Sequence, residues 1–177
     1  MSEYSAERHA GTRRFGRGMI IAAWVVLLIM LTYGFNGYLE RKENPNRNPQ
    51  SSVSDQGVAK VVLQRNARGH YVASGRINGV RVSFLLDTGA TDVAVSEQLA
   101  GRLNLRKGAA ALSRTANGTV RSWSTILDEV QLGSIRMQGV RASILPGMAA
   151  SEVLLGMSFL KNLEWLQRGD ELTLRQF

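Results

Sequence analysis

The hydrophobic positions of this chain first form one continuous apolar stretch. No residue from Gly18 to Leu39 is charged, and the centre of this stretch, MIIAAWVVLLIML, is wholly apolar. Its 22 residues meet the roughly 20 that a helix needs to cross a bilayer. No face of the stretch is polar, which excludes an amphipathic helix packed on a soluble core. The pattern therefore predicts a transmembrane helix over residues 18–39.

Beyond residue 58 the pattern changes to short alternating or apolar runs separated by turn residues. HYVASGRI, Asn78-Gly79 and VRVSFLL predict a hairpin, because Asn-Gly suits the two positive-φ positions of a tight turn. The second arm becomes wholly apolar at FLL, so its end is expected to be buried. DVAV predicts another short strand, and Ser96 is a candidate N-cap for a short helix.

The rest of the chain repeats this plan. LSRTANGTVRSWSTILDEVQL predicts a hairpin with Asn117-Gly118 at its tip, and EVQLGSIRMQGVRASIL predicts strand, turn and strand. ASEVLLGMSFLKNLEWL reads as a short apolar strand, Gly156 and a helix-like segment, and LTLRQF as a terminal strand. Residues 58–177 are therefore expected to form one compact, mostly β domain.

The flanks of the apolar stretch suggest how it is oriented. Four arginines precede it in the tail 1–17, and the three basic residues that follow are diluted by Glu40 and Glu43. This bias predicts a cytoplasmic N-terminus and an extracytoplasmic domain, in the periplasm if the cell is Gram-negative. A cleaved signal peptide is the alternative, but no A-x-A-like site follows. Residues 40–57 are polar, hold two prolines and predict a linker.

Composition narrows the chemistry that the domain can perform. The chain has no cysteine and only two histidines, so disulfides, thiolate metal sites and a histidine-based zinc site are excluded. A serine or cysteine nucleophile lacks a histidine partner for the same reason. The net charge is +8, but no nucleic-acid-binding motif accompanies it. A basic domain held near an anionic membrane is the favoured interpretation, and no nucleic-acid partner is expected.

One motif contains a candidate catalytic residue. FLLDTGAT places Asp87 at the end of an apolar strand, and LLGMSFL supplies a late apolar pair, Gly156 and a helix. With the glycine-tipped hairpin between them, residues 60–177 resemble the retropepsin-like aspartic proteases, in particular the bacterial membrane-anchored, single-lobe subgroup. The resemblance implies a closed acid-protease barrel, mostly β, with one or two short helices after the transmembrane helix. It also implies a homodimer that acts on a peptide or protein substrate without metal or cofactor.

The resemblance implies a role for each matching residue. Asp87 would be the catalytic acid/base, paired with its copy in the partner chain, because two adjacent carboxylates share one proton. Thr88 would bond across the dimer axis, and Gly89 would allow the turn and meet substrate. Substrate would also meet three residues of a flap over 115–119 and one residue of the turn, namely Ala90, Ala116, Asn117 and Gly118. The terminal strand with Phe177 would enter the dimer interface.

Departures and alternatives accompany this hypothesis. Thr91 stands where an acid often follows Asp-Thr-Gly-Ala, and Met157 stands where a charged or polar residue often follows the glycine. Considered alone, Asp87 could also be an ordinary turn residue at the end of a strand, because Asp-Thr-Gly favours turns. Asp92 is interpreted as a solvated rim acid rather than a contact to substrate or to a partner's arginine. The alternative function is a non-catalytic extracytoplasmic peptide-binding or assembly module on the same fold, since fold alone does not decide activity.

Overall fold

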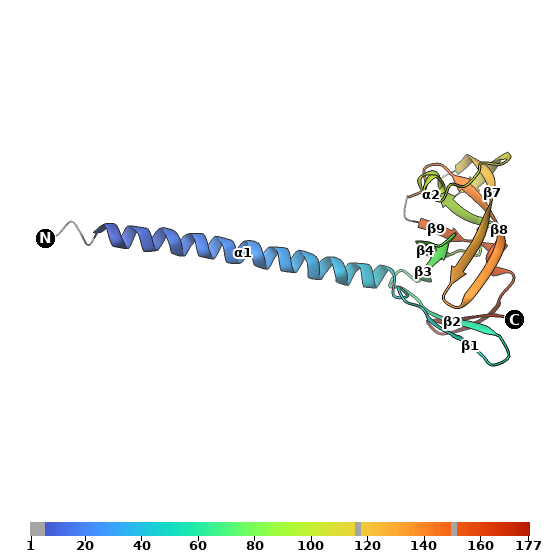
Figure 1. Cartoon of the computed structure of the whole chain (residues 1–177), viewed down its shortest axis with the longest axis horizontal. Helices are drawn as coiled ribbons and strands as arrows, with labels where there is room; N and C mark the ends of the chain where they lie inside the picture. The colour runs from blue at the N-terminus through green and yellow to red at the C-terminus, as the bar shows by residue number, and fades with distance from the viewer. Residues whose placement is uncertain (1–5, 116–117, 150–151) are drawn as a thin grey trace. The chain divides into compact units, whose positions relative to one another are not determined.

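The structure divides into two compact units. The computed structural model describes residues 6–115, 118–149 and 152–177, and for residues 6–17 it describes the backbone alone. The two units meet in the sequence between Arg41 and Lys42 (Figure 1). The first unit is a single helix and the second is a β domain.

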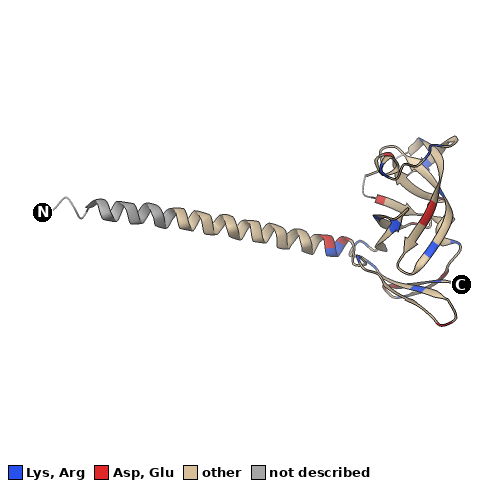
Figure 2. Cartoon of the chain, in the orientation of Figure 1, with Lys and Arg blue, Asp and Glu red and all other residues tan. Residues whose placement is uncertain are grey.

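The first unit contains helix α1 (Ala6–Glu43), except that the last two residues of the helix belong to the second unit. Its part from Gly18 to Glu43 is long and apolar enough to cross a membrane. Trp24, Leu28 and Leu31 are between 59% and 61% exposed, and no charged residue lies between Gly18 and Leu39, before the charged last turn of the helix (Figure 2). Exposed apolar surface of this extent needs a covering partner. An N-terminal helix of this kind is either a membrane span or a signal sequence.

The β domain is built on a sheet whose pairings return to their starting strand. Its strands run in the order β3-β4-β9-β5-β8-β7-β6, and β3 also pairs with β7. Six strands therefore form a closed circuit, and β6 extends it as the outer arm of a hairpin with β7. The strands are β3 (Val72–Ile77), β4 (Val80–Leu86), β5 (Val93–Ser96), β6 (Ala110–Thr115), β7 (Gly118–Leu132), β8 (Ile135–Leu145) and β9 (Glu152–Leu155). The mostly β domain expected from the sequence is confirmed.

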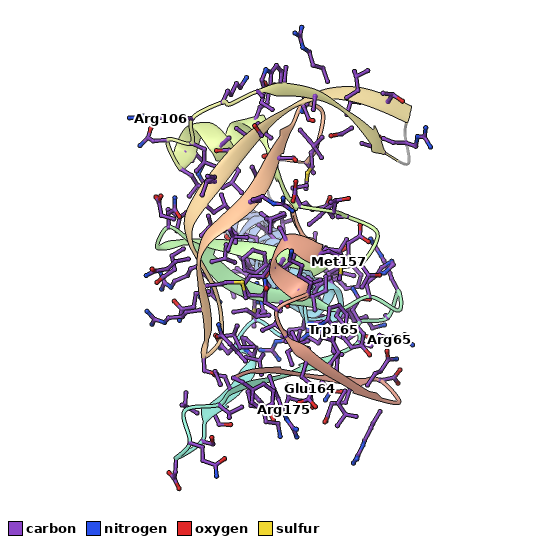
Figure 3. All side chains as sticks on the ribbon, turned by 90° about the vertical axis from the view of Figure 1, so that its right-hand side faces the viewer. Arg65, Arg106, Met157, Glu164, Trp165 and Arg175 are labelled. Atoms are coloured by element: carbon purple, nitrogen blue, oxygen red, sulfur yellow. The ribbon has the colours of Figure 1, made fainter. Side chains whose placement is uncertain are left out.

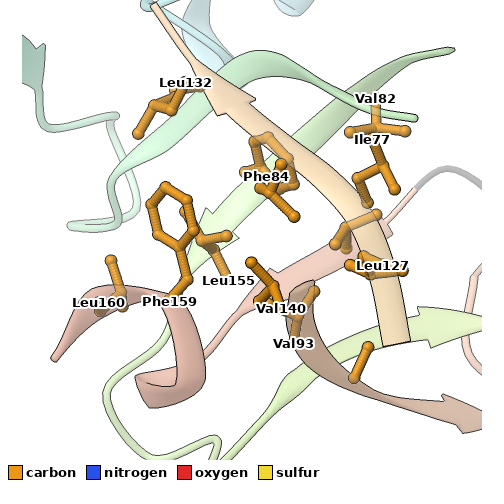
Figure 4. Close-up of a cluster of buried hydrophobic side chains, with 14 of the residues drawn as sticks. Ile77, Val82, Phe84, Val93, Leu127, Leu132, Val140, Leu155, Phe159 and Leu160 are labelled. Atoms are coloured by element: carbon orange, nitrogen blue, oxygen red, sulfur yellow. The ribbon is translucent and has the colours of Figure 1, made fainter. Parts of the chain in front are cut away.

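The interior of the circuit is apolar and supports two short helices. Phe84, Leu127 and Phe159 are fully buried at its centre (Figure 4). Helix α2 (Glu97–Arg102) follows β5, and the Ser96 hydroxyl caps it by accepting from the Leu99 N–H at 3.1 Å. Helix α3 (Met157–Leu160) follows β9. Both helices were expected.

The β3–β4 hairpin turns at the predicted dipeptide. Asn78 and Gly79 have φ values of 48° and 79°, the two positive values that a tight two-residue hairpin turn requires. The Asn78 side chain also donates to Asp128 Oδ2 at 3.1 Å, which ties the turn to β7. The turn fixes the register that delivers Phe84 to the core and Asp87 to the end of β4.

A second sheet of four strands holds both ends of the domain. Its order is β1 (Gln50–Val53), β2 (Ala59–Gln64), β11 (Glu171–Gln176) and β10 (Glu164–Arg168), all antiparallel. The sequence assigned NLEWL to a helix-like segment, which is wrong, because it enters β10. An ion pair of 3.3 Å joins Glu164 to Arg175 across β10 and β11 (Figure 3).

Since β2 and β10 flank β11, the terminal strand has no free edge to pair with another chain. Phe177, 84% exposed, stays open to contact.

The segment between α1 and β1 is docked on the domain through Asn46. This side chain is 4% exposed. It donates to Gln64 O at 2.8 Å and to Val72 O at 2.7 Å, and it accepts from Gln64 N at 2.7 Å. Its own carbonyl accepts from Ser74 N at 3.0 Å. The polar composition of residues 40–57 indicated a linker, but the structure joins part of it to the β domain. The side-chain amides of Asn44 and Asn46 bond to the domain, and residues 50–53 pair with β2 as strand β1.

Replacing Asn46 by alanine is expected to destabilise the domain by about 3 kcal/mol, because buried groups left without a hydrogen bond cost roughly 1–3 kcal/mol each. Thermal unfolding of the full chain in micelles measures this loss. Asn48→Ala is the matched control, since Asn48 is an exposed side chain of the same segment. Equal losses in the two variants would mean that Asn46 does not anchor the segment.

Candidate active site

Asp87 lies where the buried strand β4 meets a turn. Phe84, three residues earlier, is fully buried, whereas Asp87 is half-buried and Thr88 and Gly89 are exposed. The Asp87 N–H donates to Leu155 O at 3.2 Å, so β9 holds the strand end in place. The acid therefore sits at the border between the core and the surface, on a rigid central strand.

The turn uses one oxygen of the Asp87 carboxylate. Gly89 N donates to Asp87 Oδ1 at 2.8 Å, and Ala90 N donates to the Asp87 carbonyl at 3.3 Å. Asp87 thus has the turn role that its sequence context allows. Within the described part of the chain, however, its Oδ2 accepts no hydrogen bond and the carboxylate has no ion-pair partner. One oxygen orients the group and the other is left for a water, a substrate or a second carboxylate.

Because residue 156 is a glycine, the start of α3 can pack closely against the residues that follow Asp87. A Cβ at Gly156 would lie 2.2 Å from Asp92 O and 2.7 Å from Ala90 O, so any side chain there collides with backbone. Met157 N donates to Ala90 O at 2.8 Å, and Ser158 N donates to Thr91 O at 2.9 Å. Thr91 and Met157 are the two residues that depart from the family's sequence pattern. They lie where the turn meets α3, and backbone hydrogen bonds connect the two segments there.

Ser158 is a supporting residue that the sequence analysis missed. Its hydroxyl accepts from Val93 N at 3.0 Å and donates to Arg141 O at 2.8 Å, and the residue is buried. It therefore joins α3 to the start of β5 and to β8. Ser158 follows Gly156 by two residues, but a single serine at a helix start is common. Only the tertiary contacts give it this role.

Asp92 is not the solvated rim acid that the sequence favoured. Its side chain is 29% exposed and its Oδ1 lies 3.4 Å from Nη2 of Arg141, a residue of the same chain. The contact lacks hydrogen-bond geometry, since Oδ1 is buried without a hydrogen-bond partner. The sequence analysis considered an arginine of a partner, and the structure supplies one from β8 instead.

The other predicted site residues fall in two places. Thr88, Gly89 and Ala90 share the turn with Asp87, whereas Gly118 begins β7 at the β6–β7 hairpin, with φ of 109°. Its carbonyl accepts from Thr115 Oγ1 at 2.8 Å, which closes the base of the hairpin tip. Ala116 and Asn117 lie outside the described residues. No described hydrogen bond links Gly118 to the Asp87 turn.

This arrangement matches a known family. Residues 73–162 match the family model described as "gag-polyprotein putative aspartyl protease". The match covers half of the chain and contains the Asp87 turn, the β6–β7 hairpin and Gly156. The chain therefore belongs to the retropepsin-like aspartic proteases.

One solved structure and two uncharacterized proteins are similar to this chain. The crystal structure of a retropepsin-like aspartic protease from Rickettsia conorii is similar with a TM-score of 0.57 and 27% identity, over 72% of this chain and 96% of that one. An uncharacterized protein of Sinorhizobium sp. from the cobV 5′ region is 34% identical over 92% of this chain and 75% of its own. The uncharacterized protein RP867 of Rickettsia prowazekii is 25% identical over 98% of this chain and 77% of its own.

Proposed function

We propose that this chain is a membrane-anchored aspartic endopeptidase that is active as a homodimer. The observation that carries the proposal is the state of Asp87. Asp87 would be the acid of the family's Asp-Thr-Gly turn. Gly89 N donates to one of its oxygens, and the other oxygen has no hydrogen-bond partner among the described residues. A structural turn residue needs only the first of these oxygens, whereas a catalytic carboxylate needs the second.

The mechanism requires two copies of Asp87. Two carboxylates at a two-fold axis share one proton, because both cannot ionise cheaply at close range. The ionised one takes a proton from a water molecule, and the water oxygen attacks the peptide carbonyl carbon. The protonated one donates its proton to the carbonyl oxygen. When the tetrahedral intermediate collapses, the carboxyl that took the proton from water donates it to the nitrogen and the C–N bond breaks. The other carboxylate regains a proton from a hydroxyl of the intermediate. Activity is expected at acidic to mildly acidic pH, where the pair keeps its shared proton.

The neighbouring residues would position the substrate and the partner chain. Thr88 is exposed and would hydrogen-bond across the dimer axis. Gly89 and Ala90 would present backbone groups to the substrate beside the two acids. The tip of the β6–β7 hairpin, Ala116, Asn117 and Gly118, would close over the bound peptide. A positive φ at Gly118 is consistent with a tip that changes conformation.

The apolar helix would anchor the enzyme by a single span. In this proposal residues 18–39 cross the inner or cell membrane, residues 1–17 stay in the cytoplasm, and the β domain faces the periplasm or another extracytoplasmic space. Confinement of two chains to one membrane raises their effective concentration and favours the dimer.

A peptide library tests the activity directly. The full chain in detergent micelles is incubated at several acidic to neutral pH values with a mixed peptide library, and products are read by mass spectrometry. Asp87→Asn is the control, because its side-chain oxygen can still accept from Gly89 N and keep the turn. Defined cleavage products from the native chain alone are expected. Binding of peptides without cleavage would support a peptide-binding module instead, and cleavage by both chains would exclude the aspartic mechanism.

A further inference from the structure

Two arginines face each other on the outer side of the β3–β4 hairpin. In the antiparallel register Arg76 is the direct partner of Arg81, and Ser74 is the direct partner of Ser83. Arg76 and Arg81 are both exposed, whereas their neighbours Ile77 and Val82 are buried. Like charges directly opposite each other in a sheet are destabilising unless a counter-charge accompanies them. A bound anion would therefore relieve the repulsion between these two guanidinium groups.

Among the described residues, both arginines are hydrogen-bonded to backbone carbonyls rather than to acidic side chains. Arg76 Nη1 donates to Gly79 O at 2.7 Å and Arg81 Nη2 donates to Arg47 O at 2.9 Å, so backbone carbonyls orient both groups. Neither is ion-paired to a carboxylate in the described part of the chain. In contrast, Arg65, Arg68 and Arg175 each have an acidic partner within 3.8 Å. The hairpin pair is therefore oriented by backbone carbonyls, and no acidic side chain in the described ranges neutralises its charge.

The docked segment after α1 completes a pocket beside this pair. Asn44 Nδ2 donates to Ser74 Oγ at 3.1 Å, and Asn46 fixes the following backbone as described above. The resulting pocket has a volume of about 200 Å³ and is lined by nine residues, of which Arg47, Arg76 and Arg81 are charged and none is acidic. Backbone at Gly75 and Gly133 forms part of its wall. We call this cluster the arginine pocket.

We propose that the arginine pocket binds the phosphate of an anionic lipid headgroup in the membrane that holds α1. Guanidinium groups carry the charge opposite to that of phosphate, and their N–H donors fit the geometry of the phosphate oxygens. This inference depends on the proposed membrane span but not on proteolytic activity.

Chain length favours a lipid over a free phosphate as the ligand. The apolar stretch ends at Leu39, and Asn46 is already fixed to the domain seven residues later. Seven residues reach at most about 25 Å even when fully extended. Arg47, the next residue, therefore stays within a few tens of ångströms of the end of the span, roughly 25–30 Å at most. A lipid phosphate is present there at high local concentration.

Amide hydrogen exchange on the full chain in lipid nanodiscs tests the proposal. The nanodiscs contain phosphatidylcholine alone or mixed with phosphatidylglycerol, and a third sample adds inorganic phosphate to phosphatidylcholine discs. Exchange at residues 47 and 48 and in residues 74–83 is expected to slow about tenfold with phosphatidylglycerol, since bound ligand stabilises the state that binds it. Equal exchange in the two lipids would overturn the proposal. Slowing by inorganic phosphate to the same extent would overturn the assignment to lipid.

Two double variants separate a built pocket from general attraction. Arg76→Gln with Arg81→Gln is expected to abolish the lipid effect. Arg102→Gln with Arg168→Gln removes the same charge at exposed positions elsewhere in the domain and is expected to preserve it. Unchanged exchange in the core strands verifies that each variant folds. If both variants lose the effect equally, or neither does, the attraction comes from net charge and the arginine pocket is not the site.

Discussion

Mixing native chains with Asp87→Asn chains at one to nine is expected to leave about 1% of the activity of an all-native sample at the same total concentration, because only a native–native dimer holds two Asp87 carboxylates. The variant keeps the oxygen that accepts from Gly89 N, so it should fold and compete for partners. The two chains are co-expressed, their ratio is measured by mass spectrometry, and cleavage of the best library peptide is followed.

A monomeric enzyme behaves differently in the same experiment. It would retain about 10% of the activity, in proportion to the native chains, because no partner contributes to its site. Asp170→Asn is the matched control: its carboxylate is 79% exposed in an ion pair with Arg65, outside the proposed site. Mixtures with this variant should keep full activity. A linear dependence on the native fraction would contradict the paired-carboxylate mechanism while leaving the family assignment intact.

Replacing Gly156 by alanine is expected to lower the free energy of unfolding by about 3 kcal/mol, the upper range for forcing an atom into a packed site. The new Cβ would lie 2.2 Å from Asp92 O, and backbone rather than a flexible side chain would have to move. The displaced Asp87 turn should also lower kcat, since a misplacement of about 1 Å can reduce a rate roughly 100-fold. Thermal unfolding and peptide cleavage measure the two effects.

Gly101→Ala is the control for this prediction. Gly101 is the penultimate residue of helix α2, and an added Cβ there would have no atom within 4 Å apart from its chain neighbours and the helix's own backbone. Alanine in a helix interior is favoured over glycine by about 0.5–1 kcal/mol. This variant should therefore be slightly more stable and equally active. If Gly156→Ala were as well tolerated as Gly101→Ala, the close approach of the turn to α3 would not matter for the site.

Local chemistry made several elements predictable. Asn78-Gly79 specifies a hairpin turn by its backbone preferences, and Ser96 specifies a helix start by its hydroxyl. The apolar end of β4 followed by Asp87 identified the turn. Each of these features depends on residues that are adjacent in the sequence or on one distinctive residue type.

Other features escaped prediction because their partners are distant in the sequence. The apolar residues of NLEWL fit a helix or a strand, and pairing with β11 made it β10. Asp92 reads as a surface acid until β8 brings Arg141 beside it, 49 positions later. Ser158 has no distinctive context, and its hydroxyl joins two strands that only the fold brings together.

By itself the sequence determined an apolar helix, a mostly β domain and an Asp-Thr-Gly turn, because turn preferences, apolar runs and residue types act over a few neighbouring positions. The tertiary structure decided where the domain begins. Residues 44–53 have the composition of a linker, yet Asn46 satisfies buried backbone groups of β2 and β3 and fixes the segment. It also decided that Arg76 and Arg81 share one pocket with Arg47, because strand register and this docking bring the three charges together.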